Sequence, residues 1–182
     1  MKAFTERVLY HTPSKLPPKF IEEIIKEIEA SDLEDSLIGK EDISDKSIRS
    51  CKQTMFSWDG WVAGICYNTM ISANKDYFHY ELDHFSTGIQ AGIYKEGDHY
   101  DWHTDPLPFE GGKERKLSMS LLLNDDYEGG ELELELKPWH VMAKPRAGES
   151  LIFPSWLPHR VLPVTKGKRI SLVAWMNGPH WK

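Results

Sequence analysis

The first third of the chain carries its hydrophobic residues at helical spacing. In the segment LPPKFIEEIIKEIEAS, charged residues separate apolar residues that recur every three or four positions: Phe20, Ile21, Ile24, Ile25 and Ile28. This pattern, with Pro17 and Pro18 ahead of it, predicts an amphipathic helix. The segment DGWVAGICYNTMISANKDY predicts a second helix, with Asp59 as its N-cap. The polar residues 31–47 between the two helices predict a long loop.

Beyond residue 76 the pattern changes to short strand-like segments separated by turn signals. In GGELELELK the alternation is strict, which predicts a strand with leucines facing inward and glutamates outward. The predicted strands are FHYELDHF, GIQAGIY, HYDWHTD, KLSMSLLLN, GGELELELK, ESLIFP, HRVLPV and RISLVAWM. Many short strands are typical of a β-sandwich or barrel. We therefore predict a mainly β (α+β) single domain over residues 1–182, with helical support over roughly 1–75 and a β core over roughly 76–182.

Composition and charge narrow the class of protein. The 182 residues are 40% hydrophobic and 12% aromatic, enough for the packed core of one domain. The net charge of −6 disfavours nucleic-acid binding, which depends largely on neutralising phosphates. Cys51 and Cys66 match no zinc signature, and we expect both to be free thiols. No segment has the character of a signal peptide or a membrane span, so we expect a cytoplasmic protein that does not bind membranes.

Candidate metal ligands crowd into the segment HYDWHTDPLPF. His103 and Asp105 are separated by one residue, so in a strand both side chains point to the same face and can bind one metal ion. Pro106 then ends the strand, which places the pair near the rim of a sheet. Asp101 forms a rival pair with His103, and it remains open whether Asp101 is a decoy or a residue that orients a ligand.

The remaining residues of the candidate metal site lie in the segment FPSWLPHRVLPVTKGKRISLVAW. His159 begins one predicted strand, and Arg169 and Ser171 share a face of the next. We expect a hairpin centred on Lys166-Gly167, which would place His159 opposite Ala174. Arg169 would then lie about 16 Å along the strand from that pair. A histidine, a five-carbon diacid and an extended arginine together cover a gap of this order.

Two histidines and one aspartate on one side of a metal form the facial triad typical of non-haem Fe(II) oxygenases. The remaining metal positions accept a 2-oxo acid and dioxygen. An arginine deeper in the pocket binds the far carboxylate through a charge-assisted pair. Zinc would not suffice, because it has no redox chemistry. The residue pattern therefore predicts an iron-dependent oxygenase.

The order and spacing of several segments resemble the Fe(II)- and 2-oxoglutarate-dependent dioxygenase superfamily, specifically its prolyl 4-hydroxylase-like group. The resemblance covers roughly residues 47–178 and rests on SIRSCKQTMFSW, IQAGIYKEGDHYDWHTD, RKLSMSLLLN, YEGGELEL and PRAGESLIFPSWLPHRVLPVTKGKRISLVAWM. It implies a double-stranded β-helix (jelly roll) core with the N-terminal helices packed on one sheet. It also implies Fe(II), 2-oxoglutarate and O2, with ascorbate as a candidate reductant.

The resemblance also implies roles for individual residues. His103, Asp105 and His159 match the iron ligands of the family. Arg169 matches the basic residue that binds the distal carboxylate of 2-oxoglutarate, and it counts with the three ligands as catalytic. The implied reaction is hydroxylation of a substrate carbon, coupled to oxidative decarboxylation of 2-oxoglutarate to succinate and CO2.

Other residues match positions that hold the cosubstrate. Tyr94 matches a tyrosine that helps to bind 2-oxoglutarate. Leu122 stands where the oxygen-sensing branch of the family has a second tyrosine, so one hydrogen bond to the carboxylate is missing. We expect Ser171 or Tyr94 to supply it.

A third set of residues concerns the substrate. Tyr100, Arg115 and Trp175 match positions that contact the substrate proline in prolyl hydroxylases. Together they favour a proline-containing peptide or protein as substrate and partner. Two alternatives remain: the same chemistry on a free amino acid, another side chain, a lipid or a nucleobase, and a non-catalytic jelly-roll binding module. The nucleobase branch has a second arginine after the last histidine, which RISLVAW lacks.

Overall fold

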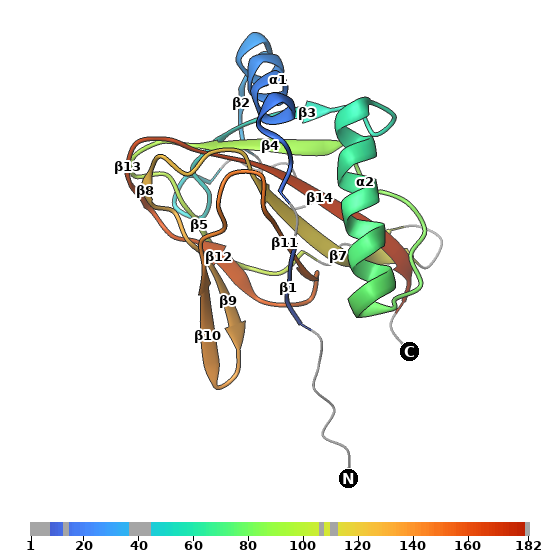
Figure 1. The fold of residues 1–182 in the computed structure, drawn as a ribbon. Helices are drawn as coiled ribbons and strands as arrows, with labels where there is room; N and C mark the ends of the chain where they lie inside the picture. The colour runs from blue at the N-terminus through green and yellow to red at the C-terminus, as the bar shows by residue number, and fades with distance from the viewer. Residues whose placement is uncertain (1–7, 13–14, 37–44, 106–107, 110–112, 181–182) are drawn as a thin grey trace.

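The computed structural model describes residues 8–12, 15–36, 45–105, 108–109 and 113–180 of the chain (Figure 1). The main sheet has eight strands in the order β1–β11–β7–β14–β4–β3–β2, with β6 paired to β7. Its strands are antiparallel: β1 (Tyr10–His11), β2 (Glu34–Asp35), β3 (Lys52–Phe56), β4 (Ile89–Tyr94), β6 (Pro108–Phe109), β7 (Lys113–Leu122), β11 (Ser150–Pro154) and β14 (Arg169–Pro179).

A four-stranded sheet, in the order β10–β9–β12–β5, completes the core with a two-stranded sheet of β13 and β8. These strands are β5 (Tyr100–His103), β8 (Glu128–Gly129), β9 (Leu132–Leu136), β10 (Trp139–Ala143), β12 (His159–Val161) and β13 (Val164–Lys166). A hydrophobic cluster joins the smaller sheet to the main one: Cys51, Tyr94, Leu132, Leu134, Leu151, Phe153, Leu157, Val161 and Val164. The predicted mainly β jelly-roll class is confirmed.

Both helices pack on the main sheet, on the face away from the smaller sheet (Figure 1). Helix α1 (Pro18–Ala30) buries Ile21, Ile24 and Ile28 in the hydrophobic cluster that lines this face. Helix α2 (Trp61–Ala73) buries Val62, Ala63, Cys66, Met70 and Ala73, and is followed by a π-helical turn, η1 (Asn74–Phe78). The predicted position of the helices on one sheet is confirmed. In the described residues, no helix combines the length and apolarity needed to span a bilayer.

The alternation along β14 shows how one strand serves two environments. Ile170, Leu172, Ala174 and Met176 belong to the cluster beneath the helices. The intervening residues line a cavity on the other face of the sheet: Arg169, Ser171, Val173 and Trp175. Successive side chains of a strand point to opposite faces, so a single sequence run positions both the core and the cavity wall.

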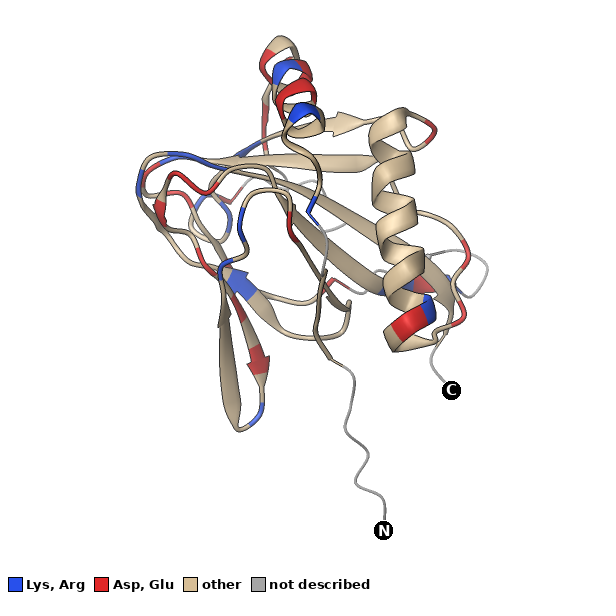
Figure 2. Ribbon diagram, viewed as in Figure 1, with Lys and Arg blue, Asp and Glu red and all other residues tan. Residues whose placement is uncertain are grey.

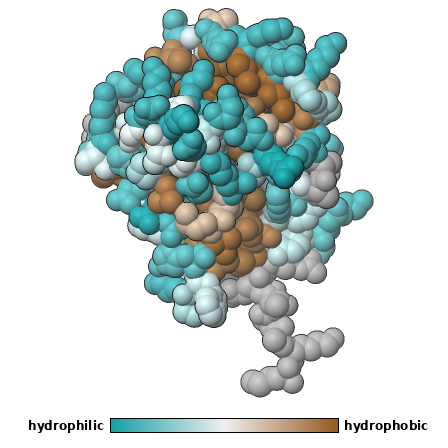
Figure 3. Space-filling model, turned by 60° about the vertical axis from the view of Figure 1, so that its left-hand side comes forward, coloured by the Kyte–Doolittle hydropathy of each residue, from teal (hydrophilic) through white to brown (hydrophobic). Residues whose placement is uncertain are grey.

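Charged residues are distributed unevenly over the surface. Helix α1 carries Lys and Glu on its exposed face, whereas α2 contains no charged residue (Figure 2). The face shown in Figure 3 is mostly hydrophilic, with hydrophobic residues gathered in two separate patches. Because α2 has no charged residue, its exposed side is unusual for a surface helix, which normally turns a polar face to water.

Several local predictions were wrong. The segment FHYELDHF forms no strand: Phe78 ends η1, and His79 has a φ of 58°. The side chain of Asn74 accepts a hydrogen bond from the backbone N–H of Tyr80 and donates one to its carbonyl, each 2.9 Å long. These bonds turn the chain at the end of the helix. The N-cap of α2 is Gly60 rather than Asp59. The carboxylate of Asp59 instead accepts a hydrogen bond from the hydroxyl of Ser57.

The expected hairpin around Lys166-Gly167 was also wrong in its pairing. Strand β12 pairs with β5 and β9, and β13 pairs with β8, whereas β14 pairs with β4 and β7. His159 therefore lies opposite His103, not opposite Ala174. The reason is topological: the two segments belong to different sheets of the jelly roll, so they enclose the cavity instead of lying side by side.

Candidate metal centre and active-site cavity

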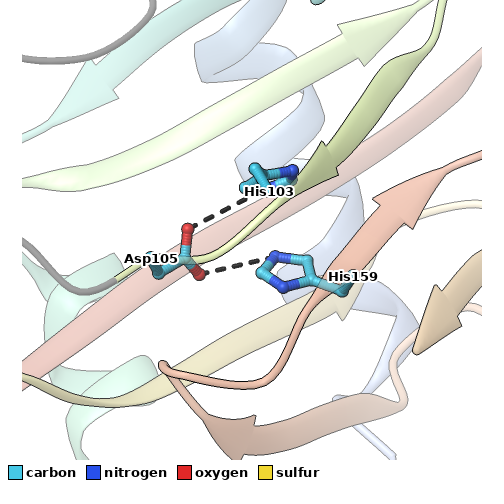
Figure 4. Close-up of side chains that lie close together, drawn as sticks. All are labelled: His103, Asp105 and His159. Carbon is cyan, nitrogen blue, oxygen red and sulfur yellow. Dashed lines mark ion pairs between the residues drawn. The ribbon is translucent and has the colours of Figure 1, made fainter. Parts of the chain in front are cut away.

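The paired strands β5 and β12 bring three candidate ligands together. His103 is the last residue of β5, Asp105 follows it by two positions, and His159 is the first residue of β12. His103 and His159 are direct partners in the sheet. Figure 4 shows the carboxylate of Asp105 facing both imidazole rings, with one oxygen directed toward each. Sequence positions more than fifty residues apart thus converge at one end of the smaller sheet.

The three side chains have metal-binding geometry. Nε2 of His103 lies 3.7 Å from Oδ1 of Asp105, and Nε2 of His159 lies 3.5 Å from Oδ2. All three ligand atoms lie within 4.8 Å of one another, and no other such cluster occurs among the described residues. Two imidazole nitrogens and one carboxylate oxygen on one side of a metal suit Fe(II) and leave other coordination positions for ligands. The donor set therefore fits the ion that the sequence predicted.

Backbone carbonyls orient both histidines. Nδ1 of His103 is 2.8 Å from the carbonyl of Asp101, and Nδ1 of His159 is 2.9 Å from that of Leu157. Because a carbonyl only accepts, each Nδ1 carries the proton and each Nε2 presents a lone pair. Asp101 acts here only through its backbone. Its carboxylate accepts a hydrogen bond from the backbone N–H of Trp102.

A chain of two serines holds the carboxylate of Asp105. The hydroxyl of Ser118 donates to Oδ2 at 2.6 Å, and the hydroxyl of Ser155 lies 2.9 Å from that of Ser118. Since the proton of Ser118 is already directed at the carboxylate, Ser155 must donate to Ser118. Both serines are buried. The carboxylate is therefore fixed before any metal binds.

Burial and mutual charge set the protonation of the site. The pKa of His103 is lowered to about 4, first by burial and then by the neighbouring His159, while Asp105 opposes both. Burial raises the pKa of Asp105, but His159, His103 and Ser118 together outweigh it, so the net shift is downward. At neutral pH the site thus holds a neutral His103 and an ionised carboxylate, which are the forms that bind a metal.

The candidate ligands open onto a cavity of about 300 Å³ between the two sheets. Nine of the ten site residues predicted from the sequence line it: Tyr94, Tyr100, His103, Asp105, Arg115, His159, Arg169, Ser171 and Trp175. The tenth, Leu122, is fully buried opposite Ser171 in the main sheet and is not part of the lining. A direct contact between Leu122 and a ligand in this cavity is therefore not supported.

Arg169 lies in the cavity, and none of the described residues provides it with an anionic partner. Its Nη1 donates a 2.7 Å hydrogen bond to Ser171, and its Nη2 is 3.5 Å from the hydroxyl of Ser120. Its Nε is buried with no partner among the described residues. Arg169 as a whole residue is 3% exposed, and a buried, uncompensated cation is costly. A ligand carboxylate would neutralise it, and the hydroxyl of Ser171 remains able to donate to the same anion.

Aromatic and cationic groups line another part of the cavity. The ring of Tyr100 stacks on that of His103, with 3.5 Å between centroids. The guanidinium of Arg115 lies 4.0 Å from the ring centroid of Trp175 and donates to the hydroxyl of Ser86 at 2.8 Å. Burial lowers the pKa of Arg115 to about 10, so it remains cationic at neutral pH. These contacts give the cavity a flat aromatic surface beside the metal ligands.

Sequence reasoning missed Arg49, Ser118 and Ser120 in this region. Arg49 is buried, lines the cavity and places its guanidinium 4.7 Å from the ring centroid of Tyr100. A signal for Arg49 was present in the segment IRSCKQTMF, where an isolated arginine precedes a strand. Ser118 and Ser120 occupy alternate positions of β7, so both side chains are on the cavity side of this strand. The segment KLSMSLLLN shows this alternation, but we predicted only a strand from it.

Comparison with known proteins places this geometry in a family. The model of the 2OG-Fe(II) oxygenase superfamily matches residues 89–177, which span every candidate ligand. The chain belongs to the 2OG-Fe(II) oxygenase superfamily. Membership implies Fe(II), 2-oxoglutarate and O2. The resemblance inferred from the sequence is confirmed.

Curated relatives of this chain include PKHD-type hydroxylases. One from Synechococcus sp. (strain CC9902) is 40% identical over 83 residues, which cover 44% of this chain and 37% of the relative. One from Hyphomonas neptunium is 41% identical over 87 residues, covering 45% and 39%. The matched segment spans about two fifths of the length of these relatives, so the likeness concerns the oxygenase core.

Solved structures show the same fold over almost the whole oxygenase. A Pseudomonas putida prolyl-4-hydroxylase has a TM-score of 0.73 at 22% identity and covers 94% of this chain and 93% of its own. A prolyl hydroxylase from Trichoplax adhaerens, in complex with a hypoxia inducible factor peptide fragment, has a TM-score of 0.77 at 19% identity, with 94% and 84% covered. At these identities the likeness establishes the shared architecture.

Proposed function

We propose that this chain is an Fe(II)- and 2-oxoglutarate-dependent dioxygenase that hydroxylates a prolyl residue in a peptide or protein. One observation carries the proposal: His103, Asp105 and His159 share a single cavity with a buried Arg169 that has no anionic partner in the part of the chain that the structure describes. The superfamily match supports the chemistry, and the names of the hydroxylase relatives and structural neighbours support the reaction class.

Each part of the site has a distinct task in this proposal. Nε2 of both histidines and the carboxylate of Asp105 would hold Fe(II). Arg169 and Ser171 would bind the distal carboxylate of 2-oxoglutarate, which places the 2-oxo acid end toward the metal ligands. The chemistry supplied with these groups is dioxygen reduction: one oxygen atom enters succinate as CO2 is lost, and the other becomes the substrate hydroxyl.

The wall of Tyr100, Arg115 and Trp175 would position the substrate. A proline ring is compact and apolar, and it packs well against aromatic side chains such as those of Tyr100 and Trp175. The guanidinium of Arg115 can donate to a backbone carbonyl of the substrate, because only part of its donor fork is used by Ser86. These groups also exclude water from the space beside the metal ligands.

Mass spectrometry of a proline-containing peptide library tests the substrate class. With Fe(II), 2-oxoglutarate and O2, we expect peptides to gain one oxygen atom at proline, and we expect Trp175→Ala to reduce this product strongly. Oxygen incorporation at another residue type, with proline unchanged across the library, would contradict the prolyl assignment and leave the dioxygenase assignment intact.

A further inference from the structure

A groove of about 680 Å³ lies on the surface beside the active-site cavity. It runs between the first half of α2, the turn before this helix and the segment 83–88 that leads into β4 (Figure 1). Its volume falls within the roughly 300–1,000 Å³ typical of ligand sites. The groove is lined by Trp58, Asp59, Gly60, Ala63, Gly64, Tyr67, Asp83, His84, Phe85, Ser86, Thr87 and Gly88.

Aromatic side chains dominate the groove and remain accessible. Trp58 is 69% exposed and Tyr67 is 46% exposed. The ring of Tyr67 meets that of Phe85 edge to face, with 6.0 Å between centroids. Exposed tryptophan and tyrosine in one concave surface mark a binding site more often than a solvated one.

The helix keeps the floor of the groove empty. Gly64 lies inside α2, and a Cβ atom added there would meet no other atom within 4 Å. A glycine inside a helix costs roughly 1 kcal/mol relative to alanine. Packing therefore does not require glycine at this position, and a larger side chain there would project into the groove.

The groove adjoins the active-site cavity, and one residue lines both. Thr87 lines both spaces. The neighbouring Ser86 lines the groove and accepts the hydrogen bond of Arg115, whose guanidinium stacks on Trp175 inside the cavity. Ser86 and Thr87 therefore place the groove next to the wall of the cavity that holds the candidate metal ligands.

The charge of the lining indicates which polypeptides fit. Among the lining residues there are two carboxylates and no Lys or Arg. The carboxylate of Asp83 is already paired with Lys113, which leaves Asp59 as the acidic group available to a ligand. An acidic segment would find no cation here, whereas a neutral or basic segment meets no repulsion.

We propose that this groove is a second substrate subsite, which binds an extended, proline-rich, neutral or basic segment next to the residue being hydroxylated. Aromatic-lined grooves recognise proline-rich segments because the polyproline II conformation is preformed and its rings stack on the aromatic faces. This inference rests on the proposed prolyl hydroxylase function and adds that affinity comes from a segment outside the catalytic cavity.

Peptide binding without turnover tests the groove directly. The protein is loaded with Fe(II) and 2-oxoglutarate under anaerobic conditions, and a fluorescein-labelled oligoproline of about ten residues, about 31 Å long, is titrated by anisotropy. Gly64→Leu fills the groove, and Trp58→Ala removes an aromatic wall. We expect each change to raise the Kd of the oligoproline roughly tenfold.

Matched controls separate the groove from the helix that forms it. Asn68→Leu places the same side chain on an exposed position of α2 that does not line the groove, and its Kd should equal that of the parent. A tripeptide with a central proline is too short to occupy both spaces. Its affinity should therefore change less than that of the oligoproline in the Gly64→Leu protein.

The possible outcomes are distinct. If the parent does not bind oligoproline, or if Gly64→Leu binds it like the parent, the groove proposal is overturned even when proline is hydroxylated. If the groove variants lose oligoproline binding but no peptide is hydroxylated, the groove is confirmed as a peptide-binding site and the assignment of prolyl hydroxylation is wrong. Concentration-dependent dimers that Gly64→Leu abolishes, seen by sedimentation, would instead assign the groove to a second copy of the chain and overturn the proposal.

Discussion

Replacing Ser118 by alanine removes the hydroxyl that fixes the carboxylate of Asp105. This hydrogen bond is 2.6 Å long and buried, and it is supported by a second bond from Ser155. A hydrogen bond to a charged group contributes about 1.5–3 kcal/mol. Losing a group that orients a metal ligand weakens metal binding about 10–100-fold, which corresponds to about 1.4–2.7 kcal/mol. The two magnitudes agree, so we expect a 10–100-fold rise in the metal Kd.

Calorimetric titration with Co(II), a redox-stable stand-in for Fe(II), measures this effect. Ser118→Thr retains the hydroxyl and should bind Co(II) close to the parent. Ser155→Ala should have a smaller effect than Ser118→Ala, because Ser155 reaches the carboxylate only through Ser118. A thermal melt of each metal-free variant separates loss of the site from loss of the fold.

Equal Co(II) affinity in Ser118→Ala and the parent would refute the reasoning. The carboxylate would then be held by the backbone alone, through the 2.8 Å hydrogen bond from the N–H of Asp105 to the carbonyl of Ser155. A loss of affinity of the same size in Ser118→Thr would also refute it, since the hydroxyl would then be irrelevant.

Two further predictions concern charge. Arg169→Gln should raise the Kd for 2-oxoglutarate at least 100-fold, because the ligand loses a buried charge-assisted pair; an unchanged Kd in calorimetry would exclude Arg169 from cosubstrate binding. The pKa of Glu149 is lowered to about 2, first by the backbone N–H of Arg146 and then by Lys15 and His11. Its stabilisation is therefore complete above the ordinary pKa of 4.5 and lost as the pH falls through about 2. Urea unfolding should show Glu149→Gln about 1–2 kcal/mol less stable at pH 7, with the difference shrinking below pH 4; a constant difference would contradict this.

The sequence predicted the local geometry of the site well, because that geometry depends on strand alternation. His103 and Asp105 at positions i and i+2 share a face, and so do Arg169 and Ser171. The same rule placed Trp175 on the cavity wall. These relations need no knowledge of which strands pair, and the structure brings all five residues to one cavity.

Long-range pairing could not be read in the same way. The turn at Lys166-Gly167 suggested a local hairpin, but the strands on its two sides pair with segments far away in sequence. The expected strand at FHYELDHF failed for a local reason that periodicity does not capture, namely the side-chain hydrogen bonds of Asn74 to the backbone of Tyr80. Arg49 was missed because its role depends on its position over the ring of Tyr100.

Succinate formation by the purified chain, supplied with Fe(II), 2-oxoglutarate and O2, tests the central claim most directly. The account predicts succinate from the parent and none above background from His159→Ala. Asp101→Asn, which changes a nearby carboxylate that does not line the cavity, should retain succinate formation because Asp101 orients His103 only through its backbone carbonyl. Undiminished succinate formation by His159→Ala, or its loss in Asp101→Asn with His159→Ala still active, would contradict the assignment of the metal centre.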